Sequence, residues 1–146
     1  MNDLISGFIE KQKCASVCCI DGEGNPYCFS CFYAFNGEDG LLYFKSSADT
    51  LHMKLIKKNP VIAGTILPDK LPLLGVKGIQ FEGLVLSFAD RLSELGSKCY
   101  HRKYPFALVI PGEVWVIQLL NMKMTDSSKG FGKKISWTIN EAAVAY

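Results

Sequence analysis

Hydrophobic and polar positions alternate along much of this chain with the period of two that characterises β-strands. Apolar or alternating runs, several of them rich in aromatic and β-branched residues, predict six strands at 14–20, 27–35, 41–44, 61–66, 76–88 and 113–125. Turn-forming residues at Asp21–Pro26 separate the first two runs and predict a hairpin. Strands in a meander with a few helices predict a mainly β fold, a six-stranded closed or split antiparallel barrel with flanking helices.

Gly83 interrupts the strand predicted at 76–88. A glycine inside a strand marks a β-bulge, a bend, or a place where a ligand or another backbone segment approaches closely. We therefore expect one of these features at this position.

One helix is predicted inside the meander and one or two more at its flanks. On residues 2–13 the apolar positions share one helical stripe, which predicts an amphipathic helix packed on the barrel: Leu4, Ile5, Phe8 and Ile9. Residues 91–103 predict a second flanking helix, closed by Tyr104-Pro105. Its last turn is basic and complements the helix dipole, so His101 is interpreted as a surface residue and not a catalytic one.

The stretch 41–67 organises the chain as strand, polar corner, helix and strand. Ser46 and Asp49 have the S-x-x-D spacing of a capping box, which predicts that the inserted helix begins at Ser46, and Asn59-Pro60 ends it. The positions predicted to face inward are Ala48, Leu51, His52, Leu55 and Ile56. Those predicted to face water are Lys54, Lys57 and Lys58.

The polar corner carries groups suited to a phosphate monoester. Lys45 supplies a cation, and Ser46, Ser47 and Thr50 supply hydroxyls beside the free amides of a helix N-terminus. The same pattern also fits an ordinary serine-rich helix cap, and Asp49 would repel a phosphate. The corner pattern alone leaves both interpretations open.

Composition favours one domain spanning 1–146, with the N-terminal helix at 2–13 and a C-terminal loop and tail at 126–146. The chain has 146 residues, of which 49% are hydrophobic and 21% charged. That apolar excess indicates a partner subunit. Both faces of the strand at 27–35 are apolar, which predicts a homodimer formed largely through the barrel strands.

Other partner classes are not expected. The apolar runs are strand-sized, far short of a membrane span, and the N-terminus lacks a basic region followed by an apolar core, so the expected compartment is the cytoplasm. A net charge of +2 is too small to indicate nucleic acid. The lysines of 129–134 fit a solvated loop better than a nucleic-acid site.

The six cysteines are interpreted as reduced, buried and inert thiols, with no metal site. Cys28 and Cys31 form a C-x-x-C, but residues three apart on a strand point to opposite faces and so would not share a metal ion. Cys18 and Cys19 face apart for the same reason, and Cys99 stands alone in a helical segment.

Three of these motifs together resemble a known family. They are the corner FKSSADTLHMKLIKKNPVIAGTI, the strand GIQFEG and, most specifically, the tail KMTDSSKGFGKKISW. They resemble the pyridoxamine 5′-phosphate oxidase-like split barrels and, within them, the small YhbP-like proteins of uncharacterised function. The resemblance covers Phe8 to Trp137. It implies a six-stranded split barrel that dimerises, with FMN in a groove between the subunits.

The resemblance also implies roles for single residues. Those expected to contact the flavin phosphate and ribityl chain are Lys45, Ser46, Ser47, Thr50 and His52, and those expected at the ring are Ser30, Phe32 and Gln80. Lys133 or Lys134 matches a late basic residue that closes over the flavin, and Trp137 would cover a ring face. The family's Arg-Lys pair falls at Leu51-His52, so a protonated His52, with Lys45 or Lys54, would have to supply the missing charge.

The function these observations favour is that of an FMN-binding protein, an FMN-dependent oxidoreductase of unknown substrate in which the flavin does the redox chemistry. FAD and a deazaflavin remain open as alternatives, and no catalytic acid or base is identified. The alternative is a non-catalytic binding or regulatory protein that has lost or exchanged the flavin. The missing arginine favours that alternative, and the hydroxyl-rich corner opposes it.

Overall fold

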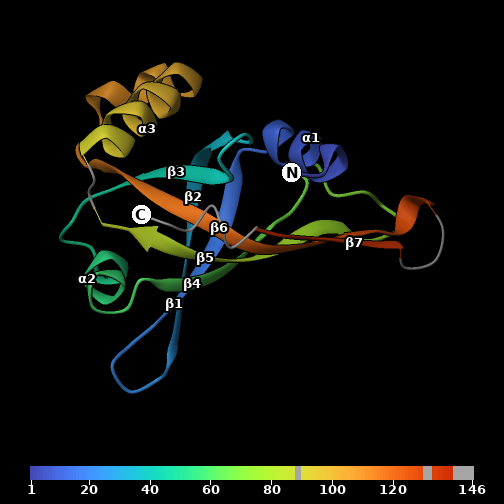
Figure 1. The fold of residues 1–146 in the computed structure, drawn as a ribbon, viewed down its shortest axis with the longest axis horizontal. Helices are drawn as coiled ribbons and strands as arrows, with labels where there is room; N and C mark the ends of the chain where they lie inside the picture. The colour runs from blue at the N-terminus through green and yellow to red at the C-terminus, as the bar shows by residue number, and fades with distance from the viewer. Residues whose placement is uncertain (88–89, 130–132, 140–146) are drawn as a thin grey trace.

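The computed structural model describes residues 1–87, 90–129 and 133–139 (Figure 1). The helical elements are α1 (Asp3–Lys11), α2 (Leu51–Lys58), α3 (Asp90–Lys103), η1 (Pro105–Val109) and η2 (Ser127–Lys129). The strands are β1 (Cys14–Ile20), β2 (Pro26–Asn36), β3 (Leu41–Ser46), β4 (Val61–Ile66), β5 (Lys77–Leu86), β6 (Glu113–Asp126) and β7 (Lys133–Thr138). Within this part of the chain, no helix is both long and apolar enough to cross a bilayer.

The strands form a closed antiparallel barrel, as the sequence predicted. Their order is β3-β2-β1-β4-β5-β6-β7, and an additional pairing of β3 with β6 closes the ring of six. The long strand β6 makes closure possible because its first half pairs with β3 and its second half with β7, while β5 runs along most of its length. The strand β7 extends the sheet beyond the ring, within the segment 126–146 that was expected to be a C-terminal loop and tail.

Gly83 lies at a shift in strand register and at a close backbone contact, two of the features expected at its position. The register between β5 and β6 shifts between Glu82 and Gly83. A Cβ atom on Gly83 would lie 2.6 Å from the backbone oxygen of Gln118, so the neighbouring strand makes the close approach. The bend helps the barrel wall curve at this point.

The helix α1 packs on the barrel through three of its four predicted apolar residues. Ile5, Phe8 and Ile9 are buried, and Leu4 is 48% exposed. Leu4 was wrongly included in the inward stripe because it lies about 100° around the helix from Ile5, at the edge of the apolar face.

The helix α2 begins later than the capping box predicted. Thr50 is its N-cap, and Ser46 is the last residue of β3, so the box at Ser46 and Asp49 was wrong. Ile56 is buried, as predicted, but the shift changes the rest of the inward stripe: Met53 is buried, whereas Leu51 is 53% exposed. The predicted end is confirmed, since Asn59 is the C-cap and Lys57 and Lys58 lie in the last turn.

The helix α3 covers a second, smaller core on the outside of the barrel wall. This core contains Ala34, Leu41, Tyr43, Tyr100, Tyr104, Ala107, Val114 and Val116. The Tyr104 hydroxyl donates to the backbone oxygen of Tyr33 at 2.8 Å and fixes the end of α3 to β2. In this way α3 and η1 are held beside the polar corner.

Candidate functional site

A pocket of about 270 Å³ lies at the polar corner, between β2, β3, α2 and η1. It brings together five of the residues expected at a flavin site: Ser30, Phe32, Lys45, Ser46 and His52. The aromatic side chains of Phe29, Phe44, Tyr100 and Phe106 complete much of its wall. We refer to this feature as the corner pocket.

His52 lies at the centre of a small polar cluster. Its Nε2 atom is 2.8 Å from the Ser46 hydroxyl and 3.1 Å from the Thr50 hydroxyl, and its ring stacks on Phe29 with centroids 3.9 Å apart. Burial lowers the pKa of His52 below its ordinary value. The side chain is therefore suited to act as a neutral hydrogen-bonding group at neutral pH, and the charge of a missing arginine has to come from elsewhere.

Lys45 supplies a cationic side chain at the wall of the corner pocket. Its Nζ atom donates to the backbone oxygen of Ala107 at 2.7 Å and lies 3.2 Å from Nε2 of His101. The opposite ring nitrogen of His101 is 2.9 Å from the backbone oxygen of Ser97. His101, interpreted from the sequence as a surface residue, is half-buried and lies beside Lys45.

The backbone before α2 offers amides, but an acidic side chain shares the corner. The amide of Ala48 donates to Oε2 of Glu113 at 3.3 Å, and the amide of Asp49 donates to the Ser47 hydroxyl at 3.3 Å. Thr50 makes no side-chain capping bond to the first turn of α2. The helix start is open to an external acceptor, while Glu113 lowers the positive potential there.

Polar side chains on the outer barrel face form a row that sequence reasoning did not find. Successive strand registers place Ser30, Ser16, Thr65, Gln80, Lys123 and Ser136 side by side across six strands. All of these except Ser30 line an open groove of about 700 Å³. Because Ser30 lines the corner pocket and its direct partner Ser16 lines the groove, the two features meet at this pair.

The remaining predicted residues lie away from the corner pocket. Gln80 lies in the groove, and Trp137 borders the groove while packing against the main core and approaching Gly40. Lys133 lies opposite Asp126 beside α1, and Lys134 lies opposite Thr125, both with exposed side chains. Within one chain these four residues and the corner residues do not converge on a single point.

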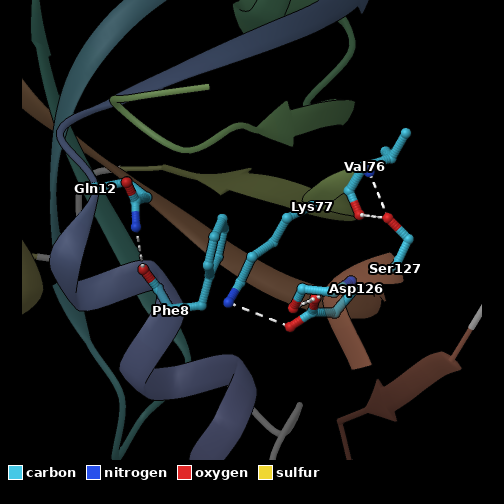
Figure 2. A network of polar contacts seen from close by, with 7 residues as sticks. Phe8, Gln12, Val76, Lys77, Asp126 and Ser127 are labelled. Carbon is cyan, nitrogen blue, oxygen red and sulfur yellow. Dashed lines mark hydrogen bonds and ion pairs between the residues drawn. The ribbon is translucent and has the colours of Figure 1, made fainter. Parts of the chain in front are cut away.

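The tail motif forms a network around Asp126 (Figure 2). The Asp126 carboxylate accepts from the Ser128 hydroxyl and amide, and it lies 3.2 Å from Nζ of Lys77. These interactions hold the pKa of Asp126 below its ordinary value, and the hydrogen bond from the Ser128 hydroxyl has the largest effect. Ser127 bonds both backbone groups of Val76. The motif therefore ties the loop before β5 to the end of β6.

The cysteines differ from the expectation that all are buried. Cys14 and Cys28 are exposed, whereas Cys19 is buried. The pair Cys28 and Cys31 does point to opposite faces, since Cys28 lines the groove and Cys31 packs against the core. Across the described residues, no group of three or more histidine, cysteine or acidic side chains is placed to hold a metal ion.

Comparison with known proteins gives close relatives by sequence. No family model matches the chain. It is 31% identical to a UPF0306 protein of Photorhabdus laumondii over 134 residues, which cover 92% of this chain and 93% of the relative. A UPF0306 protein of Yersinia pestis is 32% identical over 135 residues, 92% of this chain and 91% of the relative.

Solved structures with the same fold are more distant in sequence. A heme-binding protein from Mycobacterium smegmatis matches 90% of this chain with a TM-score of 0.74 and 15% identity, and the match spans 55% of that longer protein. An FAD-binding protein from Mesorhizobium loti has a TM-score of 0.66 at 16% identity, over 84% of this chain and 92% of its own. A Clostridium acetobutylicum protein related to general stress protein 26, of the pyridoxinephosphate oxidase family, has a TM-score of 0.66 at 17% identity, over 94% of each chain. Such identities show a shared fold and nothing finer.

Proposed function

From the premise that the chain belongs to the UPF0306 family and to the pyridoxamine 5′-phosphate oxidase-like split-barrel superfamily, we propose that it binds a flavin, with FMN as the first candidate. The observation that supports this most directly is the corner pocket, where Lys45, Ser46 and His52 lie beside Ser30 and Phe32. One protein of the same fold is described as FAD-binding, which supports the same ligand class.

The corner pocket fits the phosphate end of such a ligand. Lys45 supplies one full charge, and the first turn of α2, uncapped by Thr50, supplies directed amide donors. The hydroxyls of Ser46 and Ser47 add neutral donors, with His52 as a further neutral partner. The Thr50 hydroxyl already donates to the backbone oxygen of Ser47 at 2.9 Å. These groups bind and orient a phosphate monoester, although they bring less positive charge than a site with an arginine.

The ring end would extend from the corner pocket along the outer face of the barrel. Ser30 connects the pocket to the polar row that contains Gln80. A flavin bound there would accept and return electrons, and the surrounding side chains would position it and exclude water. We propose that the protein acts as an oxidoreductase in this way, on a small molecule whose identity is open.

A second subunit would complete this site. Three apolar side chains at the rim of the corner pocket are exposed in the single chain: Phe32 (48%), Phe106 (59%) and Ile110 (48%). Burying such side chains against another subunit is favourable. A homodimer would also allow Gln80, Trp137, Lys133 and Lys134 of one subunit to face the corner pocket of the other.

A non-catalytic binding or regulatory role is the second candidate. Two observations favour it: the Glu113 carboxylate lies at the corner amides, and Lys45 is already engaged by Ala107 and His101. Both features oppose tight phosphate binding. The two candidates differ in whether the protein takes up flavin.

Titration with FMN tests the proposal. We expect the visible absorption band of FMN to shift and its fluorescence to be quenched on addition of the protein, with saturation at one flavin per chain. Lys45→Gln, which removes the charge but keeps a polar side chain, should weaken binding by roughly ten- to a hundredfold, because a charge-assisted hydrogen bond contributes about 1.5–3 kcal/mol.

Lys54→Gln is the matched control, because Lys54 is an exposed lysine on α2 that does not line the corner pocket. It should leave FMN binding unchanged. The absence of saturable binding by the wild-type protein would support the non-catalytic alternative. Equal affinities of the wild type and Lys45→Gln for FMN would show that the ligand binds outside the corner pocket.

A further inference from the structure

Two cysteine side chains face each other on the hairpin of β1 and β2. Cys18 and Cys28 are direct partners in the register, and their Sγ atoms are 2.6 Å apart. Both are free thiols in the structure; Cys28 is exposed and Cys18 is half-buried. Both line the open groove on the outer barrel face.

The backbone at this pair suits a covalent bridge. In an antiparallel ladder, hydrogen-bonded pairs alternate with open pairs whose Cα atoms are closer, about 4.5 Å apart. The Tyr33 amide donates to Lys13 and the Asp21 amide donates to Asn25 at the two ends of the same ladder. Because the two kinds of pair alternate, counting inward from either end shows that Cys18 and Cys28 are an open pair. The Cα–Cα distance of such a pair lies within the range of about 4.4–6.8 Å that a disulfide spans.

The other cysteines are not placed to compete for either thiol. Cys14 lies opposite Phe32, Cys31 opposite Ala15 and Cys19 opposite Tyr27. Cys99 is on α3. Burial raises the pKa of Cys31 to about 12 and also raises the pKa of Cys19, which keeps these thiols protonated and unreactive.

We propose that Cys18 and Cys28 form a redox-active dithiol that is oxidised to an intramolecular disulfide by small, water-soluble disulfides of the glutathione type. The exposed Cys28 thiolate attacks one sulfur of the small disulfide, whose S–S bond breaks and releases one thiol. Cys18 then loses its proton and attacks the Cys28 sulfur, which releases the second thiol. The protein gives up two electrons, and the small disulfide is reduced to two thiols.

The order of attack follows from the surroundings of the two sulfurs. The hydrogen bond with Cys28, together with burial, raises the pKa of Cys18 to about 11, so Cys18 is the poorer first nucleophile. Cys28 is more open to the solvent. Once Cys28 carries the mixed disulfide, Cys18 is adjacent to it and acts as the resolving thiol.

The groove suits a reagent of this class. Its lining near the two thiols carries the polar side chains of Thr65, Gln80, Glu82, Asn121 and Lys123. The Asn121 side-chain amide donates to the Glu82 carboxylate at 3.0 Å, and Lys123 offers a cation to the carboxylates of a small peptide. The hairpin already holds the two sulfurs side by side, so the bridge can form with little movement of the backbone. A disulfide of this kind should also be reduced again by excess thiol, which makes the site reversible.

The test uses the full-length reduced protein and oxidised glutathione. We expect the intact mass to fall by two hydrogen atoms without retained glutathione, and peptide mapping to find Cys18 joined to Cys28. Phenylarsine oxide, which bridges adjacent thiols, should bind the reduced protein and block this oxidation. Cys18→Ser should instead accumulate a glutathione adduct on Cys28, while Cys99→Ser, the matched control, should behave as the wild type.

Three results would overturn the proposal. These are a stable glutathione adduct on Cys28 in the wild type, a disulfide between other cysteines, and no reaction with oxidised glutathione as the pH is raised to favour thiolates. None of these measurements requires a variant to fold, because each is made on the wild-type protein. None depends on flavin binding.

Discussion

Lys45 and Glu113 oppose each other electrostatically at the corner pocket. Lys45 lies at the pocket wall, and Glu113 accepts from the Ala48 amide at 3.3 Å beside the start of α2. The negative charge of Glu113 offsets part of the attraction that Lys45 and the amides before α2 exert on an anion. The strength of phosphate binding should therefore depend on which of these two side chains is neutralised.

Glu113→Gln should strengthen FMN binding. The substitution keeps an oxygen that accepts from the Ala48 amide and removes the negative charge that repels a phosphate. Since Glu113 is exposed and its field is screened by solvent, we expect a gain of about threefold to tenfold, larger at low salt. Isothermal titration at two salt concentrations measures it. Glu23→Gln in the β1–β2 turn is the control, and equal affinities for both variants would contradict the prediction.

His52 should make folding stability depend on pH. Its pKa is lowered in the folded protein, so the unfolded chain takes up a proton at His52 more readily than the folded one. Stability should therefore fall as the pH drops from about 7 through the unfolded pKa of about 6.5 toward the lower folded value. Thermal unfolding of wild type and His52→Gln across this range should give curves that converge at lower pH. Parallel curves would mean that His52 does not contribute.

At the scale of elements, two glycines differ in the space around them. Gly83 lies against the backbone of β6, whereas Gly7, in the middle of α1, has no atom within 4 Å of where its Cβ would stand. The two positions predict opposite effects for the same substitution.

Gly83→Ala should destabilise the protein by about 1–3 kcal/mol, because the added methyl group would lie 2.6 Å from the Gln118 oxygen and force the strands apart. Gly7→Ala should stabilise it by about 0.5–1 kcal/mol, since alanine loses less conformational entropy in a helix. Urea unfolding of both variants measures the difference. A neutral Gly83→Ala would show that the bulge absorbs the extra atom.

The sequence predicted the secondary-structure elements better than it predicted the arrangement of the candidate site. Apolar or alternating runs located every strand of the ring, and Gly83 marked the place where the register between β5 and β6 shifts, because both signals depend on local backbone geometry. The start of α2 was misplaced because Ser46 bonds His52 and not the helix amides, a contact that spacing does not reveal. The polar row and the Cys18–Cys28 pair depend on strand registers, which alternation alone does not specify.

At the scale of the whole molecule, the exposed apolar rim of the corner pocket predicts self-association. Light scattering at micromolar concentration should give the mass of a dimer, whose interface should bury about 1,200–2,000 Å² if it is of ordinary size. Phe32→Asp places a charge at that rim and should shift the protein toward the monomer while its far-ultraviolet circular dichroism stays unchanged. A wild-type monomer over the whole concentration range would contradict the proposed two-subunit site.

Closure of the barrel by β3 and β6 also determines how the chain can reach its native state. Ser46 pairs with Glu113 and Leu41 with Gln118, so the last seam of the ring joins segments separated by α2, β4, β5 and α3. The loop entropy of that seam is lost before its hydrogen bonds form, and topologies of this kind fold in milliseconds to seconds, far more slowly than helical bundles. Until the seam closes, β3 and the first half of β6 present unpaired edges. Newly made chains are then most exposed to misassembly with one another.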